Sequence, residues 1–141
     1  MSFTLAPNKG RVHLQSTVIV VDDDPALVEL ICDVLNDEGI ATESCPYGHK
    51  AHPCISRKQP KAVILDIQMP QVDGIQLFTT LRADPATAII PVIFFTANAH
   101  RLLHWYPNFE ELDATLVQKP FDLTQFIKTV TETLACYGAN N

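Results

Sequence analysis

Four short hydrophobic runs of the chain each end on a charged or hydroxyl-bearing residue. The runs are rich in Val, Ile and Phe and lack polar alternation, a pattern typical of strands buried on both faces of a parallel sheet. They cover residues 17–22, 62–66, 91–96 and 114–119, and they end on Asp22, Asp66, Thr96 and Lys119. Because ligands bind outside the carboxyl ends of parallel strands, we expect these four side chains to face one crevice. There they can bind a divalent metal ion and a phosphoryl group.

Helical segments separate the runs. Asp24 is a good N-cap and Pro25 suits the first helical position, so we expect them to begin a helix that Gly39 ends. A short strand near residues 40–45 and a helix at 48–58 follow, and Pro53 should interrupt that helix.

The second half of the chain repeats this order. A helix follows the loop at 68–74 and ends at Asp84-Pro85, residues 98–112 should form a helix interrupted by Pro107, and Asp122 can cap a final helix. Five repeats of strand then helix predict an α/β fold, with a parallel sheet covered by helices on both faces.

Length and composition indicate one globular domain. A chain of 141 residues is long enough to bury about two-thirds of its unfolded surface. We expect residues 1–16 to form a flexible N-terminal tail, 17–137 the domain and 138–141 a C-terminal tail, with no output domain.

Charge, hydropathy and cysteine usage narrow the classes of function. The 16 acidic and 10 basic residues give a formal charge of −6, and the basic residues are scattered, so we expect no direct DNA binding. No apolar run reaches the roughly 18–20 residues of a membrane span and no signal-peptide core is present, so we expect no membrane insertion and a cytoplasmic protein. The four cysteines form no CxxC pair, which favours a reducing compartment.

Four motifs, in order, resemble those of a known family. They are VVDDDP at 20–25, LDIQMPQVDG at 65–74, PVIFFTA at 91–97 and KPF at 119–121. Together they resemble the receiver domain of two-component response regulators, of the single-domain chemotaxis-regulator type, over roughly residues 17–136. The resemblance implies a flavodoxin-like, doubly wound five-stranded sheet of order 2-1-3-4-5, with helices on both faces.

The resemblance also implies a role for each acidic residue. Asp66 would be the nucleophile that becomes an acyl phosphate. Mg²⁺, or Mn²⁺ in its place, would be held by Asp22, Asp23, Asp66 and the backbone carbonyl of Gln68, since these ions prefer oxygen ligands. Clustered carboxylates repel one another, so without a cation at least one of them should bind its proton more tightly.

Further residues would contact the phosphoryl group or shape its site. Lys119 would provide a mobile positive charge and Thr96 a hydroxyl donor for phosphoryl oxygens. Pro120 implies a cis peptide bond after Lys119, and Asp73 is better interpreted as a helix N-cap than as a metal ligand. The residues expected to shape the site are Ala97, Pro120, Met69, Pro70, Asp73 and Gly74.

Three functions compete at this point. The leading one is a stand-alone phosphorylation switch, which takes its phosphoryl group from a histidine kinase or phosphotransfer protein and signals by binding a downstream protein or by phosphorelay; a homodimer is compatible with it. Such a chain is not an enzyme acting on a metabolite, since it catalyses only its own phosphorylation and slow dephosphorylation. The alternatives are a constitutive interaction module and an aspartyl phosphatase, which Gln68 disfavours because such enzymes usually carry a second Asp at that position.

Two segments depart from the family pattern. Leu116 occupies a position that is aromatic in many receivers, which puts their usual switching mechanism in question. Trp105 and Tyr106 would either anchor a partner, if exposed, or cover the core.

A second group of residues suggests a metal site only weakly. Cys45, His49, His52 and Cys54 lie within ten residues, but their spacing matches no usual zinc pattern, so we expect buried cysteines and surface histidines. His100 and His104 lie four residues apart, and we interpret them as surface residues of one helix face.

Overall fold

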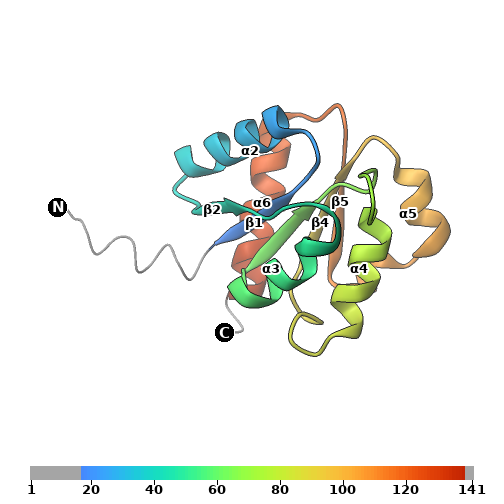
Figure 1. The fold of residues 1–141 in the computed structure, drawn as a ribbon. Helices are drawn as coiled ribbons and strands as arrows, with labels where there is room; N and C mark the ends of the chain where they lie inside the picture. The colour runs from blue at the N-terminus through green and yellow to red at the C-terminus, as the bar shows by residue number, and fades with distance from the viewer. Residues whose placement is uncertain (1–16, 139–141) are drawn as a thin grey trace.

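The computed structural model describes residues 17–138 as one five-stranded parallel sheet between two layers of helices (Figure 1). The strands are β1 (Val18–Val21), β2 (Thr42–Ser44), β3 (Ala62–Leu65), β4 (Val92–Thr96) and β5 (Ala114–Gln118). Their order in the sheet is β2-β1-β3-β4-β5. The predicted flavodoxin-like fold and strand order are therefore confirmed.

The helices follow the strands as the sequence predicts. The α-helices are α2 (Pro25–Asp37), α3 (Ala51–Lys58), α4 (Gly74–Ala83), α5 (Ala99–Trp105) and α6 (Leu123–Gly138), and two 3₁₀ turns are η1 (Gly48–Lys50) and η2 (Phe109–Leu112). Helix α6 includes Gly138, one residue of the expected C-terminal tail; residues 1–16 and 139–141 of the expected tails lie outside the described part of the chain.

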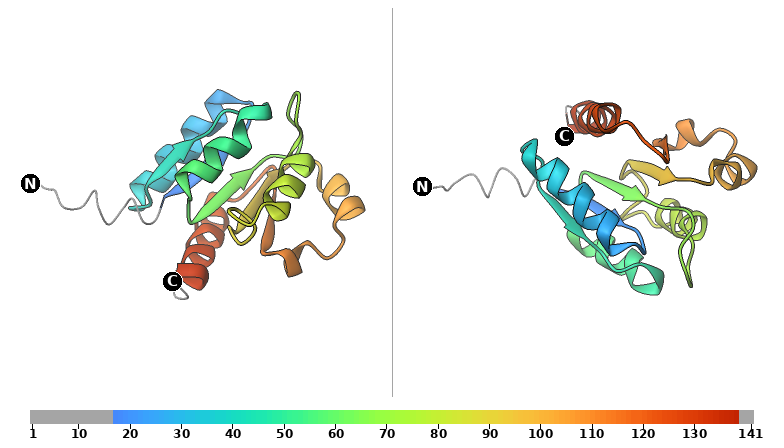
Figure 2. Two further views of the ribbon diagram at one scale, coloured as in Figure 1. Left: turned by 60° about the horizontal axis from the view of Figure 1, so that its bottom comes forward. Right: turned by 90° about the horizontal axis from the view of Figure 1, so that it is seen from above.

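Two hydrophobic clusters fill the space on either side of the sheet. Alternate residues of β1, β3 and β4 point to opposite faces, as strand geometry requires. One cluster joins the sheet to α3, α4 and α5, and the other joins it to α2 and α6. Figure 1 accordingly shows α3 and α4 on the near side of the sheet and α6 on the far side, and Figure 2 shows the same layers from two other directions.

The predicted helix boundaries hold where capping chemistry sets them. The Asp24 side chain accepts hydrogen bonds from the N–H groups of Ala26 and Leu27, and Asp122 accepts one from Thr124. Gly39, just past the end of α2, has φ +81°, a left-handed conformation that glycine adopts without steric cost.

The two prolines expected to interrupt helices behave differently. Pro53 lies in the first turn of α3, where a missing N–H costs no intrahelical hydrogen bond, so the expected interruption at Pro53 is wrong. Pro107 lies between α5 and η2, so the helix expected over 98–112 is broken there as predicted.

Trp105 and Tyr106 divide between the two roles considered for them. Trp105 is 61% exposed, whereas Tyr106 packs edge-to-face on Phe78 with ring centroids 5.1 Å apart and hydrogen-bonds through its hydroxyl to Thr79. Leu116 is half-buried and packs against the cluster beneath α3, α4 and α5. Tyr106 thus covers the core, whereas Trp105 faces solvent.

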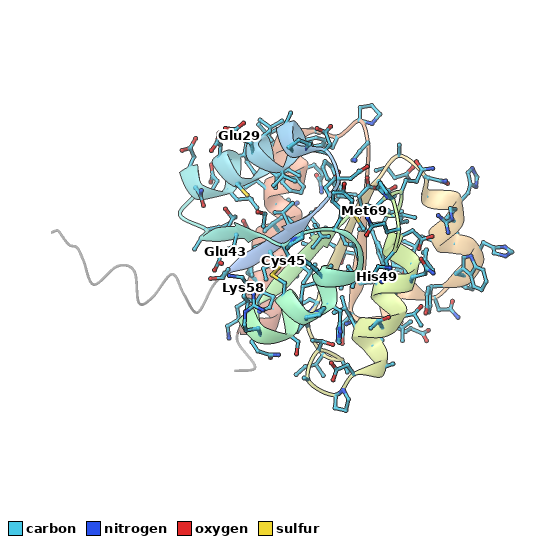
Figure 3. The ribbon with its side chains drawn as sticks, viewed as in Figure 1. Glu29, Glu43, Cys45, His49, Lys58 and Met69 are labelled. Atoms are coloured by element: carbon cyan, nitrogen blue, oxygen red, sulfur yellow. A yellow bond between two sulfur atoms is a disulfide. The ribbon has the colours of Figure 1, made fainter. Side chains whose placement is uncertain are left out.

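Cys45 and Cys54 are buried, as expected, but they form a disulfide, which the lack of a CxxC pair and the favoured reducing compartment did not predict. The chain turns through η1 and brings the end of β2 next to α3, so the two Cα atoms lie 6.0 Å apart. Figure 3 shows Cys45 at this junction, with the Lys58–Glu43 ion pair tying α3 to β2 nearby. His49 is exposed and His52 pairs with Asp84 at 2.7 Å, so a shared metal site with the cysteines is not formed.

Candidate functional site

The two central strands place Asp22 and Asp66 side by side at the carboxyl edge of the sheet. Val21 pairs with Leu65, and the N–H of Asp66 donates to the carbonyl of Val21 at 3.2 Å. Both residues are buried, with 9% of Asp22 and 7% of Asp66 exposed to solvent. The exposed Asp23 completes a group whose three carboxylate oxygens all lie within 4.8 Å of one another. Such a cluster of oxygen donors suits a small divalent cation.

Lys119 bridges the two buried carboxylates. Its Nζ lies 3.3 Å from Asp66 Oδ2 and 3.4 Å from Asp22 Oδ2. The ammonium group also lies 5.1 Å from the centre of the Phe95 ring, so an aromatic face supports its position. The peptide bond between Lys119 and Pro120 is cis, as the resemblance implied.

Thr96 ends β4 next to Lys119. Its carbonyl accepts a hydrogen bond from the N–H of Lys119 at 2.9 Å. The side chain is fully buried, and its Oγ1 accepts a hydrogen bond from the N–H of Asn98 at 3.1 Å. Ala97, the next residue, is exposed and small. The hydroxyl is therefore held in place at the strand end, beside a residue with a small side chain.

Burial shapes the charge of the site. Burial raises the pKa of Asp22 above its ordinary value, although the hydrogen bond from the N–H of Asp24 opposes this shift; the nearby Asp66 charge adds to it and Lys119 reduces it. The expectation that one carboxylate of the cluster binds its proton more tightly is confirmed at Asp22. Burial, rather than repulsion among the carboxylates, is the largest cause.

The loop after β3 is held by its contact with the start of α4. Gly74 donates from its N–H to the carbonyl of Ile67 at 2.8 Å. A Cβ atom at Gly74 would lie 2.2 Å from the backbone oxygen of Asp66, so only glycine permits this approach. The N–H of Gln68 donates to Asp66 Oδ1 at 3.3 Å. The segment following Asp66 thus packs closely against the backbone of Asp66 and bonds to its carboxylate.

Asp73 performs the predicted capping role and a second one that the sequence did not indicate. Its Oδ1 accepts from the N–H of Gln76 at 2.9 Å, and the Gln76 side chain accepts from the N–H of Asp73, which completes a capping box. Its Oδ2 lies 2.6 Å from Nη2 of Arg101. Partial burial opposes ionisation, but the bonds from Gln76 and Arg101 outweigh it and lower the pKa of Asp73.

A hollow of about 410 Å³ opens next to the acidic cluster. Met69, labelled in Figure 3, lies in the loop between β3 and α4 and lines this hollow. The lining residues are Asp23, Gln68, Met69, Pro70, Gln71, Asp73 and Arg101. Sequence reasoning placed most of these residues at the site but missed Arg101, which lies 28 positions after its partner Asp73.

In the part of the chain that the structure describes, no helix is both long and apolar enough to cross a lipid bilayer.

Comparison with known proteins supports one family. The family model for the response regulator receiver domain matches residues 18–131. The DNA-binding dual master transcriptional regulator RpaA of Synechocystis sp. is 30% identical over 113 residues, which cover 80% of this chain and 46% of that protein. An uncharacterized 14.6 kDa protein of Leptolyngbya boryana is 30% identical over 125 residues, which cover 84% of this chain and 89% of that protein. The chain therefore spans less than half of RpaA and most of the second relative.

Solved structures share the fold. A putative response regulator from Chloroflexus aurantiacus superposes with a TM-score of 0.74 at 28% identity, covering 85% of this chain and 98% of that one. The receiver domain of the sensor histidine kinase PA1611 from Pseudomonas aeruginosa, which has a magnesium ion coordinated in its active-site cleft, gives a TM-score of 0.73 at 21% identity, with coverage of 85% and 98%.

Proposed function

This chain belongs to the family of response regulator receiver domains, and we propose on that premise that it is a phosphorylation switch with Asp66 as its phosphoacceptor. Receivers are signalling modules of two-component systems that work with histidine kinases and downstream targets. The observation that carries the proposal is the position of Lys119, whose ammonium group lies within 3.4 Å of both Asp66 and Asp22.

Asp66 has the environment of a nucleophile for phosphoryl transfer. One of its carboxylate oxygens attacks the phosphorus of a phosphohistidine donor, the P–N bond breaks with its electron pair returning to the imidazole, and an acyl phosphate forms. Such transfer requires mainly position and neutralisation of charge. The contact with Gly74 and the bond from Gln68 fix the position of Asp66. Lys119 offers a donor to a phosphoryl oxygen, and Thr96 offers its hydroxyl to another.

The carboxylates of Asp22, Asp23 and Asp66, with the backbone carbonyl of Gln68, would hold Mg²⁺ or Mn²⁺. The 4.8 Å spread of the three carboxylates suits oxygen coordination of a small ion. When bound, the ion supplies positive charge to the phosphoryl oxygens. Ala97 leaves space for the group, and the cis bond to Pro120 sets the direction of the chain after Lys119.

The downstream step is protein binding or onward transfer of the phosphoryl group. We propose a single-domain mode of action. The match covers 89% of the 14.6 kDa relative, which supports this mode, and 46% of RpaA, which does not. The switch would act by shifting the population of two surface conformations, since the phosphoryl group makes contacts with Thr96 and Lys119 in only one of them.

A constitutive interaction module is the second candidate. The half-buried Leu116 favours it, because no aromatic side chain at that position is present to turn inward when Thr96 moves. The two candidates differ in whether Asp66 takes up a phosphoryl group.

The test is phosphoryl uptake by the purified protein. With Mg²⁺ and acetyl phosphate, we expect an intact-mass gain of one phosphoryl group that is lost in base, and no gain in Asp66→Asn or in the presence of a chelator. Asp33→Asn, which alters an exposed carboxylate of α2, is the matched control and should take up phosphate like the unaltered chain. Lack of uptake from acyl phosphate, phosphoramidate and phosphohistidine donors alike would favour the interaction module, and uptake that persists in Asp66→Asn would contradict the assignment of Asp66.

A further inference from the structure

Arg101 carries a positive charge to the mouth of the acidic site. It lies in the first turns of α5, and its Nη2 contacts Asp73 Oδ2 at 2.6 Å. Its side chain remains 39% exposed, so the ion pair is accessible to solvent and to a ligand. Ion pairs of this kind contribute little to stability when they are exposed to solvent. The pair therefore needs no strong disruption to open.

The hollow next to the acidic cluster has an unequal distribution of charge. Among the described residues that line it, Asp23 and Asp73 are acidic and Arg101 alone is basic. Lys119 contacts Asp22 and Asp66 and does not line this hollow. A phosphodonor that approaches through the hollow carries negative charge and meets carboxylates first, so a positive group there lowers the electrostatic barrier to entry.

We propose that Arg101 is a phosphodonor-binding residue, which exchanges its contact with Asp73 for an oxygen of the incoming phosphoryl group. The inference rests on the proposed function of Asp66 and deepens it by naming a second cation for the donor. A guanidinium group is planar, always charged and matched to phosphate oxygens in a bidentate manner, which suits it to this role. The ligand class is a phosphoryl dianion on a nitrogen or acyl leaving group.

Arg101 can leave Asp73 without disturbing the start of α4. Its Oδ1 caps α4 through Gln76, while the separate Oδ2 holds Arg101. When Arg101 leaves, the cap remains, and so does the reciprocal bond from the N–H of Asp73 to the Gln76 side chain, so α4 and the loop after Asp66 keep their anchor. Asp73 thus holds Arg101 near the hollow, and it keeps its role as the N-cap of α4 when Arg101 moves to the donor.

Trp105 provides a natural reporter of this movement. A groove of about 560 Å³ between α4 and α5 is lined by Asp73, Arg101 and Trp105 among others, so the ion pair borders both this groove and the hollow. Trp105 is the single tryptophan of the chain. Departure of the Arg101 guanidinium changes the charge and solvent near the indole ring, and its fluorescence should respond.

The kinetic test uses two variants that break the same ion pair. Arg101→Gln removes the cation, and we expect the acetyl phosphate concentration giving half-maximal phosphorylation to rise about three- to tenfold at low salt, with the difference shrinking as salt screens it. Asp73→Asn keeps a capping side chain and releases Arg101, so the same concentration should fall. A merely structural ion pair predicts a shift in the same direction for both variants. Arg101→Lys should recover part of the lost affinity, and Arg57→Gln, on an exposed position of α3, should change nothing.

A binding experiment separates this inference from the proposed function. In Asp66→Asn, which has no acceptor, titration with acetyl phosphate should still change Trp105 fluorescence, and the change should disappear in the Asp66→Asn, Arg101→Gln double variant. If the unaltered chain never takes up a phosphoryl group but its fluorescence still responds to acetyl phosphate through Arg101, Arg101 is retained as an anion-binding residue and Asp66 is rejected as the phosphoacceptor. Shifts of equal sign in Arg101→Gln and Asp73→Asn, or a fluorescence change independent of Arg101, would overturn the inference.

Discussion

Replacing Gly74 by alanine should damage both stability and phosphorylation. An added Cβ would lie 2.2 Å from the Asp66 carbonyl oxygen and 2.7 Å from the Ile67 Cα, against 3.4–4 Å for an ordinary contact. Both neighbours are backbone atoms, so no side chain can rotate away. The first turn of α4 and the loop after β3 must therefore separate by about an ångström, which we expect to cost about 2–4 kcal/mol of the free energy of unfolding.

Gly39→Ala is the matched control for this substitution. Gly39 has φ +81° and no heavy atom within 4 Å of the added Cβ, so only backbone strain of about 1–2 kcal/mol is expected. Gly74 shows the opposite combination, with a φ outside the left-handed region and no space. The pair therefore separates the cost of close approach from the cost of conformation.

The measurements are urea denaturation followed by circular dichroism and the initial rate of phosphoryl uptake with acetyl phosphate. Gly74→Ala should lower both, because the displaced carbonyl belongs to Asp66 itself, whereas Gly39→Ala should lower stability alone. A Gly74→Ala protein with the stability of Gly39→Ala and an unaltered rate of uptake would show that the loop yields freely. The argument that Gly74 positions Asp66 would then be refuted.

Two further predictions concern Asp22 and the disulfide. Burial raises the pKa of Asp22, so the folded state binds this proton more tightly than the unfolded state, and the metal-free protein loses that stability as pH rises through the raised pKa. Without metal, the melting temperature should therefore decrease less between about pH 4 and pH 7 in Asp22→Asn than in the unaltered chain. A larger decrease in Asp22→Asn would contradict the direction of the pKa shift. Reduction of the Cys45–Cys54 bond, whose cysteines are 9 positions apart, should lower the free energy of unfolding by about 2–3 kcal/mol. The stability of the Cys45→Ser, Cys54→Ser variant should not change with reductant, whereas that of Cys32→Ser should decrease as in the unaltered chain. If reductant leaves the stability of the unaltered chain unchanged, the result would argue against the disulfide.

The local chemistry of the chain was sufficient to predict most of the fold. Hydrophobic runs ending on Asp22, Asp66 and Thr96 predicted three strands, because buried parallel strands need no information from distant residues to be recognised. Asp24 and Asp73 predicted two helix starts, because a cap bonds to N–H groups two or three positions away. These inferences depend on contacts that are short along the chain.

Contacts between distant segments were not predictable in the same way. The Asp73–Arg101 pair joins residues 28 positions apart and depends on how α4 approaches α5. The disulfide depends on the turn through η1, which brings the end of β2 against α3. In both cases the residue types were visible in the sequence, but the distance between them was set by tertiary packing.

Neighbouring residues can also differ for reasons that periodicity does not show. Trp105 and Tyr106 are adjacent and similar in chemistry, yet one is exposed and the other packs on Phe78. Helix α5 ends at Trp105, and the change in backbone direction turns the next side chain toward α4. Pro53 likewise depends on where α3 begins, since the first turn tolerates proline and the interior does not.

The pairing of Val21 with Leu65 has a consequence for misfolded molecules. A slip of one residue between β1 and β3 would turn an entire strand over and send one acidic group to the opposite side of the sheet. Under the function that we propose for Asp66, chains with such an error would be unable to receive the phosphoryl group. A phosphodonor added to a mixed population would then label only molecules whose central strands are correctly aligned.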